Sequence, residues 1–315
     1  KNMRKRQKLF NYAHYENFLR DDGEANEILK TTKFKSDTPE GEATLRSRFA
    51  QRLALRKLMA MYTAGEEISS LIPQLEYLVE KYEIRQAALA LSEQSPEISP
   101  LAIDDWPHEY EECVQIIGLC ILLHRTDLLK RFVKLIDNAG YAGDDTLYED
   151  LLRKILPGRT DVDQWYHDVY SPLVQAIYAK TKEEATSFLK KYCSQWYPAF
   201  KQAPWHDTHL QGEEGNYVGY WAFEAGAIAF LYRIDDSKID HMVYPKDLVE
   251  YARNYHPTNG SQVARVDAGQ PCIKTGYWFT SARAESRRYF NQGDIMPKFD
   301  DSIWGDTIWY WSGEE

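Results

Sequence analysis

Several kinds of segment are scarce or missing in this sequence of 315 residues. It has only four cysteines, and no two of them form a Cys-x-x-Cys pair, which argues against a zinc-finger or disulfide framework. No apolar run approaches the roughly 20 residues needed to cross a bilayer. No secretory signal is visible at the start of the chain. We therefore expect reduced, buried thiols, a cytoplasmic location and no contact with a membrane.

Familiar motifs of small-molecule chemistry are missing as well. The sequence has no Gly-x-Gly-x-x-Gly segment and no phosphate loop. No serine stands in a convincing nucleophile constellation, since Ser237 follows Asp235 and Asp236 in a pattern typical of a turn or helix cap. We expect no catalytic residue, no cofactor and no resident metal ion, so the chain is not predicted to be an enzyme.

Negative charge dominates, but it is unevenly distributed. The whole chain carries a net charge of −10. Residues 1–57 hold 14 Lys and Arg against 8 Asp and Glu, a net charge of +6, while residues 97–150 hold 4 against 12, a net charge of −8. A strongly acidic region repels nucleic acid and attracts basic surfaces. This argues against direct binding of nucleic acid and favours a protein partner with a basic surface.

Apolar residues at three- and four-residue spacing predict a mainly α-helical fold. We expect two helical units, arranged as an antiparallel bundle or an array of helix pairs. The first covers residues 1–95 and the second covers residues 105–255, with a proline-rich linker between them. Short aromatic runs near residues 277–280 and 308–311 predict an irregular or β-hairpin-containing tail over residues 256–315.

Capping residues place several helix ends. Gly65 is expected to stop a long helix, and Pro73 is tolerable only in the first turn of the next one. Thr126 and Asp145 are candidate caps of two later helices. Thr181 opens a Thr-x-x-Glu capping box.

The segment from Tyr217 to Ser237 predicts a helix with a carboxylate on its apolar face. Trp221, Glu224 and Ile228 share that face by spacing. A buried charge is costly unless it is paired or hydrogen-bonded. We expect a His or Trp side chain of the preceding loop, residues 205–209, to hydrogen-bond Glu224 in a structural network. A structural set is therefore predicted from Trp205, His206, His209, Trp221, Glu224, Asp235 and Asp236.

The same residues allow an alternative interpretation as a metal site. His206, Asp207, His209 and Glu224 could serve a helical metal-dependent hydrolase. Their spacing matches no defined zinc signature, so a structural role is the preferred interpretation.

Two charged sets are candidates for contact with a partner. Arg46, Arg48, Arg52 and Arg56 could contact nucleic acid, although a solvated helix face is the preferred interpretation. The acidic set is the candidate docking surface for a basic partner, because complementary charge speeds association and fixes register. It consists of Asp104, Asp105, Glu109, Glu111, Glu112, Asp144 and Asp145.

Several motifs resemble those of one family. Residues 58–68 resemble a segment of the N-terminal PoNi domain. The segments Trp205-His206-Asp207-Thr208-His209, 217–225, 234–237 and 244–249 resemble successive motifs of its C-terminal PoNi domain, with Lys246 departing from the usual aromatic residue. The resemblance covers roughly residues 9–252 in order. Residues 268–272, 275–280, 286–290 and 305–309 resemble a C-terminal segment found on immunity proteins of type VI secretion systems.

The resemblance implies a function. PoNi proteins are immunity proteins that protect bacteria from polymorphic nuclease effectors delivered between cells. A member is expected to be a cytoplasmic antitoxin that binds its cognate nuclease effector and blocks the active or substrate-binding site. The resemblance names no interface residues, and it leaves open whether the chain forms a homodimer.

Overall fold

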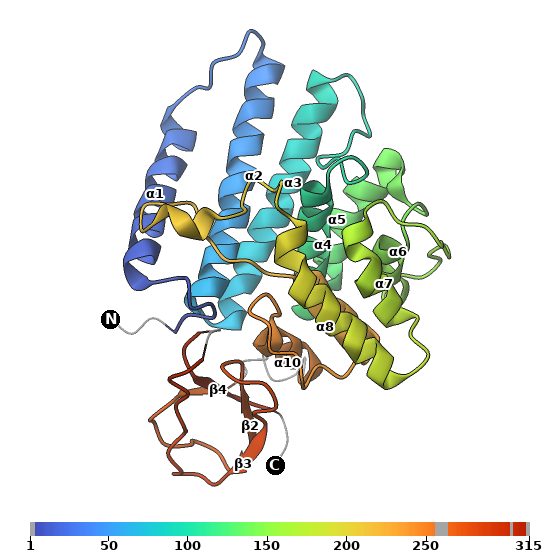
Figure 1. Ribbon diagram of the computed structural model, residues 1–315. Coiled ribbons are helices and arrows are strands. Elements are labelled where there is room, and N and C mark those ends of the chain that lie inside the picture. Colours follow the sequence, from blue (N-terminus) through green and yellow to red (C-terminus); the bar gives the residue numbers. More distant parts are fainter. Residues whose placement is uncertain (1–3, 256–263, 303–304, 313–315) are drawn as a thin grey trace.

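The computed structural model describes residues 4–255, 264–302 and 305–312, and these contain ten α-helices and four β-strands. In chain order the elements are α1 (Tyr12–Thr31), α2 (Pro39–Ala64), α3 (Leu71–Ser92), α4 (Pro107–Leu122), α5 (Thr126–Ile136), α6 (Thr146–Arg153), α7 (Ser171–Ile177), α8 (Lys182–Ala199), α9 (Phe223–Leu231), α10 (Lys246–Arg253), β1 (Arg265–Asp267), β2 (Gly276–Thr280), β3 (Arg288–Phe290) and β4 (Ile308–Trp311). The fold is mainly α-helical with a small sheet near the carboxyl end (Figure 1), as the sequence predicts.

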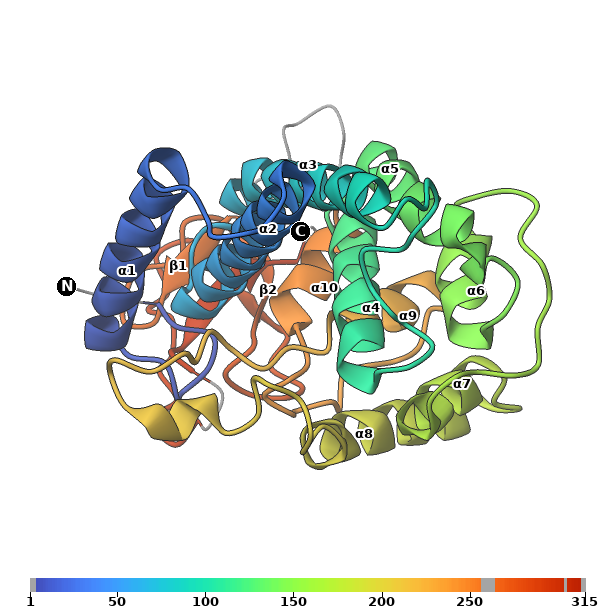
Figure 2. The ribbon, with the colours of Figure 1, turned by 90° about the horizontal axis from the view of Figure 1, so that it is seen from above.

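Helices α1, α2 and α3 form the N-terminal unit and lie side by side with α2 in the middle (Figure 1 and Figure 2). Pro39 occupies the first turn of α2, where the Thr38 hydroxyl accepts a hydrogen bond from the Gly41 amide at 2.9 Å. The helix ends where Gly65 takes a φ of +92°, a conformation that favours glycine. Pro73 lies in the first turn of α3, so both predicted helix boundaries are confirmed.

Helix α4 is the centre of the second unit, and α5, α6, α9 and α10 pack around it. Gly118 permits close approach of α9, because a Cβ at this position would lie 2.9 Å from the backbone of Phe223. A single hydrophobic core runs from Phe10 to Ala252, so the two helical units share it. The division of the chain into residues 1–95, 105–255 and 256–315 as separate domains stays a prediction.

The tail is a four-stranded antiparallel sheet in the order β1-β4-β2-β3. The two aromatic runs are its strands β2 and β4, which pair with each other. Side chains alternate between the faces of a strand. Trp278 and Trp309 pack into the core of the tail itself, whereas Phe279 and Tyr310 stack on the opposite face at 5.5 Å.

Residues at the N-terminus connect the tail to the helices. Arg4 forms an ion pair with Asp267 of β1 at 2.9 Å. Two residues later, Arg6 forms a buried ion pair with Asp247 of α10 at 2.5 Å. The N-terminal segment therefore contacts both parts of the molecule, consistent with its position between them (Figure 1).

The predicted helix over residues 217–237 is too long. Only Phe223–Leu231 is α-helical, and Gly219 takes a φ of +113° in the segment before it. The Ala222 amide donates to the Val243 carbonyl at 2.9 Å, so this segment pairs with another part of the chain. Trp221 therefore lies outside the helix. Helix α9 is buried on nearly all sides, so it has no distinct apolar face.

The predicted caps have mixed outcomes. Asp145 caps α6 by accepting from the Tyr148 amide at 2.8 Å. Thr126 is the first residue of α5, so it is not the cap. Thr181 accepts from the Glu184 amide at 3.1 Å, but the Glu184 carboxylate accepts from the Lys180 amide, so the box is only half formed. Among the described helices, none has the length and apolar character that a membrane span requires.

Candidate partner-binding surface and the buried carboxylates beneath it

Glu224 is fully buried, and its neighbour in the core is a second fully buried carboxyl group, Glu111 of α4. The Tyr192 hydroxyl donates to Glu224 Oε2 at 2.7 Å. The Tyr170 hydroxyl and the Trp196 indole N–H donate to the two oxygens of Glu111, at 2.8 Å and 3.2 Å. The two carboxyl groups are close enough for each to influence the pKa of the other. The aromatic donors to this pair therefore come from α8, which carries Tyr192 and Trp196, and from Tyr170 just before α7.

Burial disfavours the ionised form of both carboxyl groups. Burial raises the pKa of Glu111 well above its usual value, and the negative charge of Glu224 raises it further. Burial also raises the pKa of Glu224, while its hydrogen bonds with Glu111 and Tyr192 oppose that rise. Two buried carboxylates in contact cannot both stay ionised, so one of them keeps its proton. Glu224 Oε1 is buried and has no hydrogen-bond partner, so it is an acceptor available to a protonated Glu111.

The expected hydrogen bond from the 205–209 loop to Glu224 is wrong. Tyr192 of α8 is the hydroxyl donor. Trp205 reaches the network only indirectly, because it stacks at 5.1 Å on Trp196, the donor to Glu111. A tyrosine donor carries no charge, so it satisfies the carboxyl group without adding another buried ion.

The histidines of the loop have partners of their own. His206 stacks on Tyr197 with ring centroids 4.1 Å apart, and His209 Nδ1 lies 2.7 Å from the Tyr220 hydroxyl. The structure does not bring these residues together with Glu224. In the part of the chain that the structure describes, no group of three or more His, Cys, Asp or Glu side chains is arranged to hold a metal ion. The hydrolase alternative therefore has no support in the geometry.

The other members of the predicted structural set lie at separate junctions. The Trp221 indole donates to the Thr63 hydroxyl of α2 at 2.9 Å. Asp236 is buried and accepts from Tyr244 at 2.5 Å and from Arg253 at 2.8 Å. Its neighbour Asp235 is exposed and closes a turn. The set therefore stabilises several contacts between elements rather than one helix junction.

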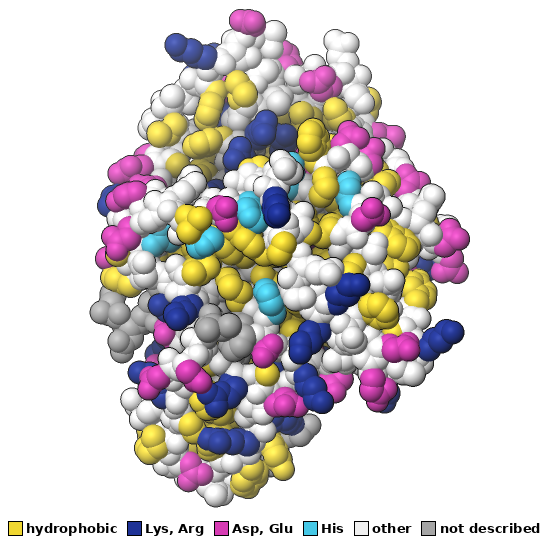
Figure 3. All heavy atoms as spheres, in the orientation of Figure 1, with side chains coloured by type: hydrophobic (Ala, Val, Ile, Leu, Met, Phe, Trp, Pro, Cys, Tyr) yellow, Lys and Arg dark blue, Asp and Glu magenta, His cyan; other side chains and the backbone are white. Residues whose placement is uncertain are grey.

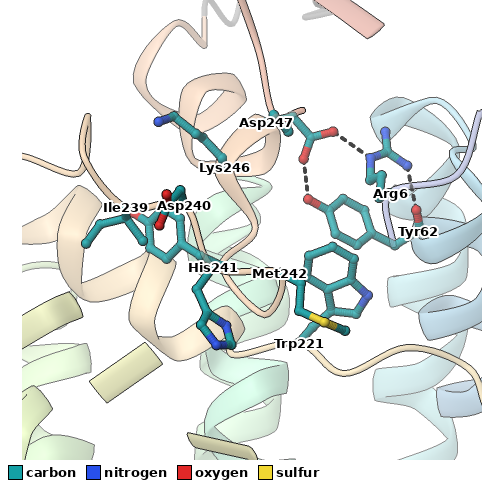
Figure 4. Close-up of a pocket in the computed structure, with 11 residues that line it drawn as sticks. Arg6, Tyr62, Trp221, Ile239, Asp240, His241, Met242, Lys246 and Asp247 are labelled. Carbon is teal, nitrogen blue, oxygen red and sulfur yellow. Dashed lines mark hydrogen bonds and ion pairs between the residues drawn. The ribbon is translucent and has the colours of Figure 1, made fainter. Parts of the chain in front are cut away.

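One buried network was missed by the sequence analysis. Arg6 and Asp247 are 241 positions apart, yet they form an ion pair that also includes the Tyr62 hydroxyl (Figure 4). Arg6 also donates to the Tyr62 carbonyl at 2.7 Å. The adjoining cavity has a volume of about 20 Å³, which suits a single water molecule. No local pattern could have predicted this contact, because Arg6 lies among several other basic residues at the start of the chain.

The predicted acidic set divides into buried and exposed members. Glu111 and Asp145 are buried, so including them in a docking surface was wrong. Asp145 accepts from the Tyr148 and Tyr166 amides and from the Tyr110 hydroxyl. Glu109 and Glu112 are half-buried; the first accepts from the Ala102 amide and the second from the Tyr82 hydroxyl. Asp104, Asp105 and Asp144 are exposed.

The exposed members of the set share a surface with aromatic residues. The Tyr141 hydroxyl donates to Asp104 at 2.8 Å, and the Tyr166 hydroxyl donates to Asp144 at 3.0 Å. The two tyrosine rings meet edge to face at 6.2 Å. Asp104 and Asp144, far apart in sequence, are therefore joined by a tyrosine pair.

An exposed tryptophan extends this surface. Trp106 follows Asp105 directly in the chain, and 55% of its surface is accessible. Exposed Trp and Tyr side chains are common energetic centres of protein interfaces. We use "acidic surface" for Asp104, Asp105, Trp106, Tyr141, Asp144 and Tyr166. The sequence analysis missed the aromatic members, because their exposure depends on the packing of α4 and the 137–170 region.

Comparison with known proteins identifies part of this architecture. Residues 143–248, from just before α6 into α10, match the family model described as PoNe immunity proteins (PoNi), C-terminal. This match covers about a third of the chain. The matched region contains Glu224, the 205–209 loop, Asp236 and Asp144. The PoNi resemblance is therefore confirmed there, whereas the resemblances of the N-terminal unit and of the tail stay predictions.

A solved structure supports the fold of the larger part of the chain. The crystal structure of Protein PA2201 from Pseudomonas aeruginosa superposes with a TM-score of 0.59 and 18% sequence identity, covering 80% of this chain and 92% of that chain. At this identity the similarity concerns the fold alone. No curated protein sequence matches the chain.

Proposed function

We propose that this chain is an immunity protein that binds a nuclease-type effector of the type VI secretion kind and neutralises it in the cytoplasm. The match of residues 143–248 to PoNe immunity proteins is the observation that carries this proposal. Binding, rather than catalysis, is the proposed mode of action. Structural partners that donate to Glu111, Glu224 and Asp236 support this proposal.

The acidic surface is the proposed contact region. A nuclease must present positive charge to the phosphate backbone of its substrate. Three exposed carboxylates can occupy such a region, and Trp106 adds apolar contact beside them. The chain would then block the nuclease by covering its active or substrate-binding site. Nucleic acid itself would not bind here, because the charges repel.

The experiment uses the effector candidate encoded beside the gene for this chain. Purified effector should form a stable complex with the chain on size-exclusion chromatography, and an excess of the chain should abolish its nuclease activity. Cells that express the effector should survive only when the chain is co-expressed. A nuclease activity that stays unchanged at a tenfold excess of the chain would refute the proposal.

A further inference from the structure

Four arginines form a second charged region of the N-terminal unit, on α2 and α3. Arg48, Arg52 and Arg56 are spaced four apart on α2, so they share one side of that helix. Arg85 lies on α3, which packs against α2. We call these four residues the arginine face. The upper half of Figure 3 shows Lys and Arg side chains gathered over α2 and α3, between hydrophobic side chains.

Among the described residues, no carboxylate lies within ion-pair distance of the arginine face, although Glu112 acts electrostatically on Arg85 and Arg52. Within the described residues, none of the four arginines makes an ion pair within 4.0 Å. Arg85 Nη1 is buried without a hydrogen-bond acceptor, whereas Arg56 donates to the Asn216 carbonyl at 3.3 Å. On the same helix α3, Glu76 pairs with Arg125 and Glu83 with Arg131, both from the α5 side. Two arginines that reach α3 from the α5 side are therefore neutralised, whereas Arg85 of α3 itself has no ion pair.

Arg46 is a useful contrast on α2. Its guanidinium pairs with Glu42 at 2.9 Å and donates to the carbonyls of Leu29 and Thr32. It fastens the end of α1 to α2, so its charge is used within the fold. The sequence alone had placed Arg46 in one group with Arg48, Arg52 and Arg56.

The unpaired arginines repel one another in the free protein. Burial lowers the pKa of Arg85 and the nearby charge of Arg48 lowers it further, while Glu112 only partly opposes this. Burial likewise lowers the pKa of Arg56 and Arg52 adds to the effect, while Asp22 and Asp21 oppose it. A bound anion would relieve this repulsion. Guanidinium groups are suited to carboxylates, because their parallel N–H donors match two carboxylate oxygens.

We propose that the arginine face binds a carboxylate-bearing segment of the effector, beside the acidic surface that binds its basic region. This inference rests on the proposed function. Arg48 and Arg52 would receive two acidic side chains spaced about one helical turn apart. The face would then set the orientation of the effector, because positive and negative charges must both find their complements.

A protein carboxylate fits this face better than a nucleic acid does. Glu109 and Glu112 lie within electrostatic reach of Arg85. A continuous phosphate backbone that ran across the arginines would meet these carboxylates and the acidic surface. Separate carboxylates on a folded partner can contact the arginines alone, so the mixed charge of this region favours a protein.

The test compares two double variants that each remove two exposed positive charges four residues apart. Arg48→Gln/Arg52→Gln changes the arginine face on α2. Lys130→Gln/Lys134→Gln is the matched control on α5, where both lysines are also exposed. Binding of the effector is measured by titration calorimetry at several salt concentrations, and binding of a DNA duplex by fluorescence anisotropy. Circular dichroism checks that both variants keep their thermal stability.

The arginine variant should bind the effector about tenfold more weakly at low salt, with a shallower dependence on salt, while the lysine variant should match the wild type. Equal affinities for the wild type and the arginine variant would overturn the inference and leave the proposed function intact. An effector that binds none of the proteins would overturn both. Duplex binding by the wild type that the arginine variant loses, with effector affinity unchanged, would assign the face to nucleic acid instead.

Discussion

The chain has two pairs of adjacent aspartates in which one residue is buried and its neighbour is exposed. Asp145 and Asp236 are buried, and tyrosine, arginine and backbone donors occupy their oxygens. Their neighbours Asp144 and Asp235 are exposed. One step along the chain thus separates a residue that stabilises the fold from one available to a partner. Charge counted along a sequence cannot separate these roles, because the direction of each side chain decides them.

The largest expected effect separates Asp145 from Asp144. Asp145→Ala removes the cap of α6 and leaves the Tyr110 hydroxyl and the Tyr166 amide without their acceptor. We expect a loss of roughly 3–5 kcal/mol of unfolding free energy, since each unsatisfied buried donor costs about 1–3 kcal/mol. Asp144→Ala should cost about 0.5 kcal/mol or less. Urea denaturation followed by circular dichroism measures the unfolding free energy of both variants. Equal losses would contradict the structural role of Asp145 and the exposed position of Asp144.

Substitution of buried Asp236 should cost more unfolding free energy than substitution of exposed Asp235, but the difference should be smaller than for Asp145 and Asp144. Asp236→Ala deprives Arg253 and Tyr244 of their shared acceptor, but Arg253 keeps its ion pair with Glu250 at 2.6 Å. A loss of roughly 2–3 kcal/mol is expected. Asp235→Ala loses only a turn hydrogen bond to Ser237, at a cost of about 0.5–1 kcal/mol. A larger loss for Asp235→Ala in the same denaturation assay would reverse our placement of the two residues.

A third prediction uses pH to examine the buried carboxyl pair. Folded Glu111 holds its proton at pH values where the unfolded chain has released it, because burial and Glu224 raise its pKa. The wild type should therefore lose stability as the pH rises above the unfolded value near 4.5. Glu111→Gln keeps a hydrogen-bond donor but cannot titrate.

The stability of Glu111→Gln relative to the wild type should therefore improve with rising pH, by up to about 1.4 kcal/mol per pH unit between pH 5 and 7. Asp105→Asn, at an exposed carboxylate, is the control and should not change the slope. Denaturation midpoints measured across this range give the answer. If the stability of Glu111→Gln and that of the wild type changed equally with pH, Glu111 would not hold a proton in the folded protein at these pH values.

The sequence predicted the elements of this fold better than their contacts. Gly65, Pro73 and Asp145 marked helix ends correctly, because caps and breakers act through their own backbone and near neighbours. Helix α9 was predicted too long, since tertiary pairing of Ala222 with Val243 holds the residues before it in an extended segment. Local periodicity contains no information about that distant strand-like contact.

The candidate site was only partly predictable from the sequence, because its contacts also join residues that are far apart in the chain. Spacing showed that Glu224 needs a partner, but it could not identify Glu111, which lies 113 positions earlier on α4. The acidic composition of residues 97–150 indicated a charged surface. It could not separate Glu111 and Asp145, which point into the core, from Asp104 and Asp144, which the tyrosine pair joins on the surface.

The central claim is that exposed carboxylates bind the effector while buried ones only stabilise the fold. The most direct measurement is the association rate of the effector with Asp104→Lys/Asp105→Lys/Asp144→Lys, determined by stopped-flow fluorescence at low and high salt. A control reverses three other exposed carboxylates, as Glu24→Lys/Asp240→Lys/Asp300→Lys. The first variant should associate at least about tenfold more slowly than the control at low salt, and the difference should shrink as salt screens the charges. Equal association rates for the two variants would contradict the account.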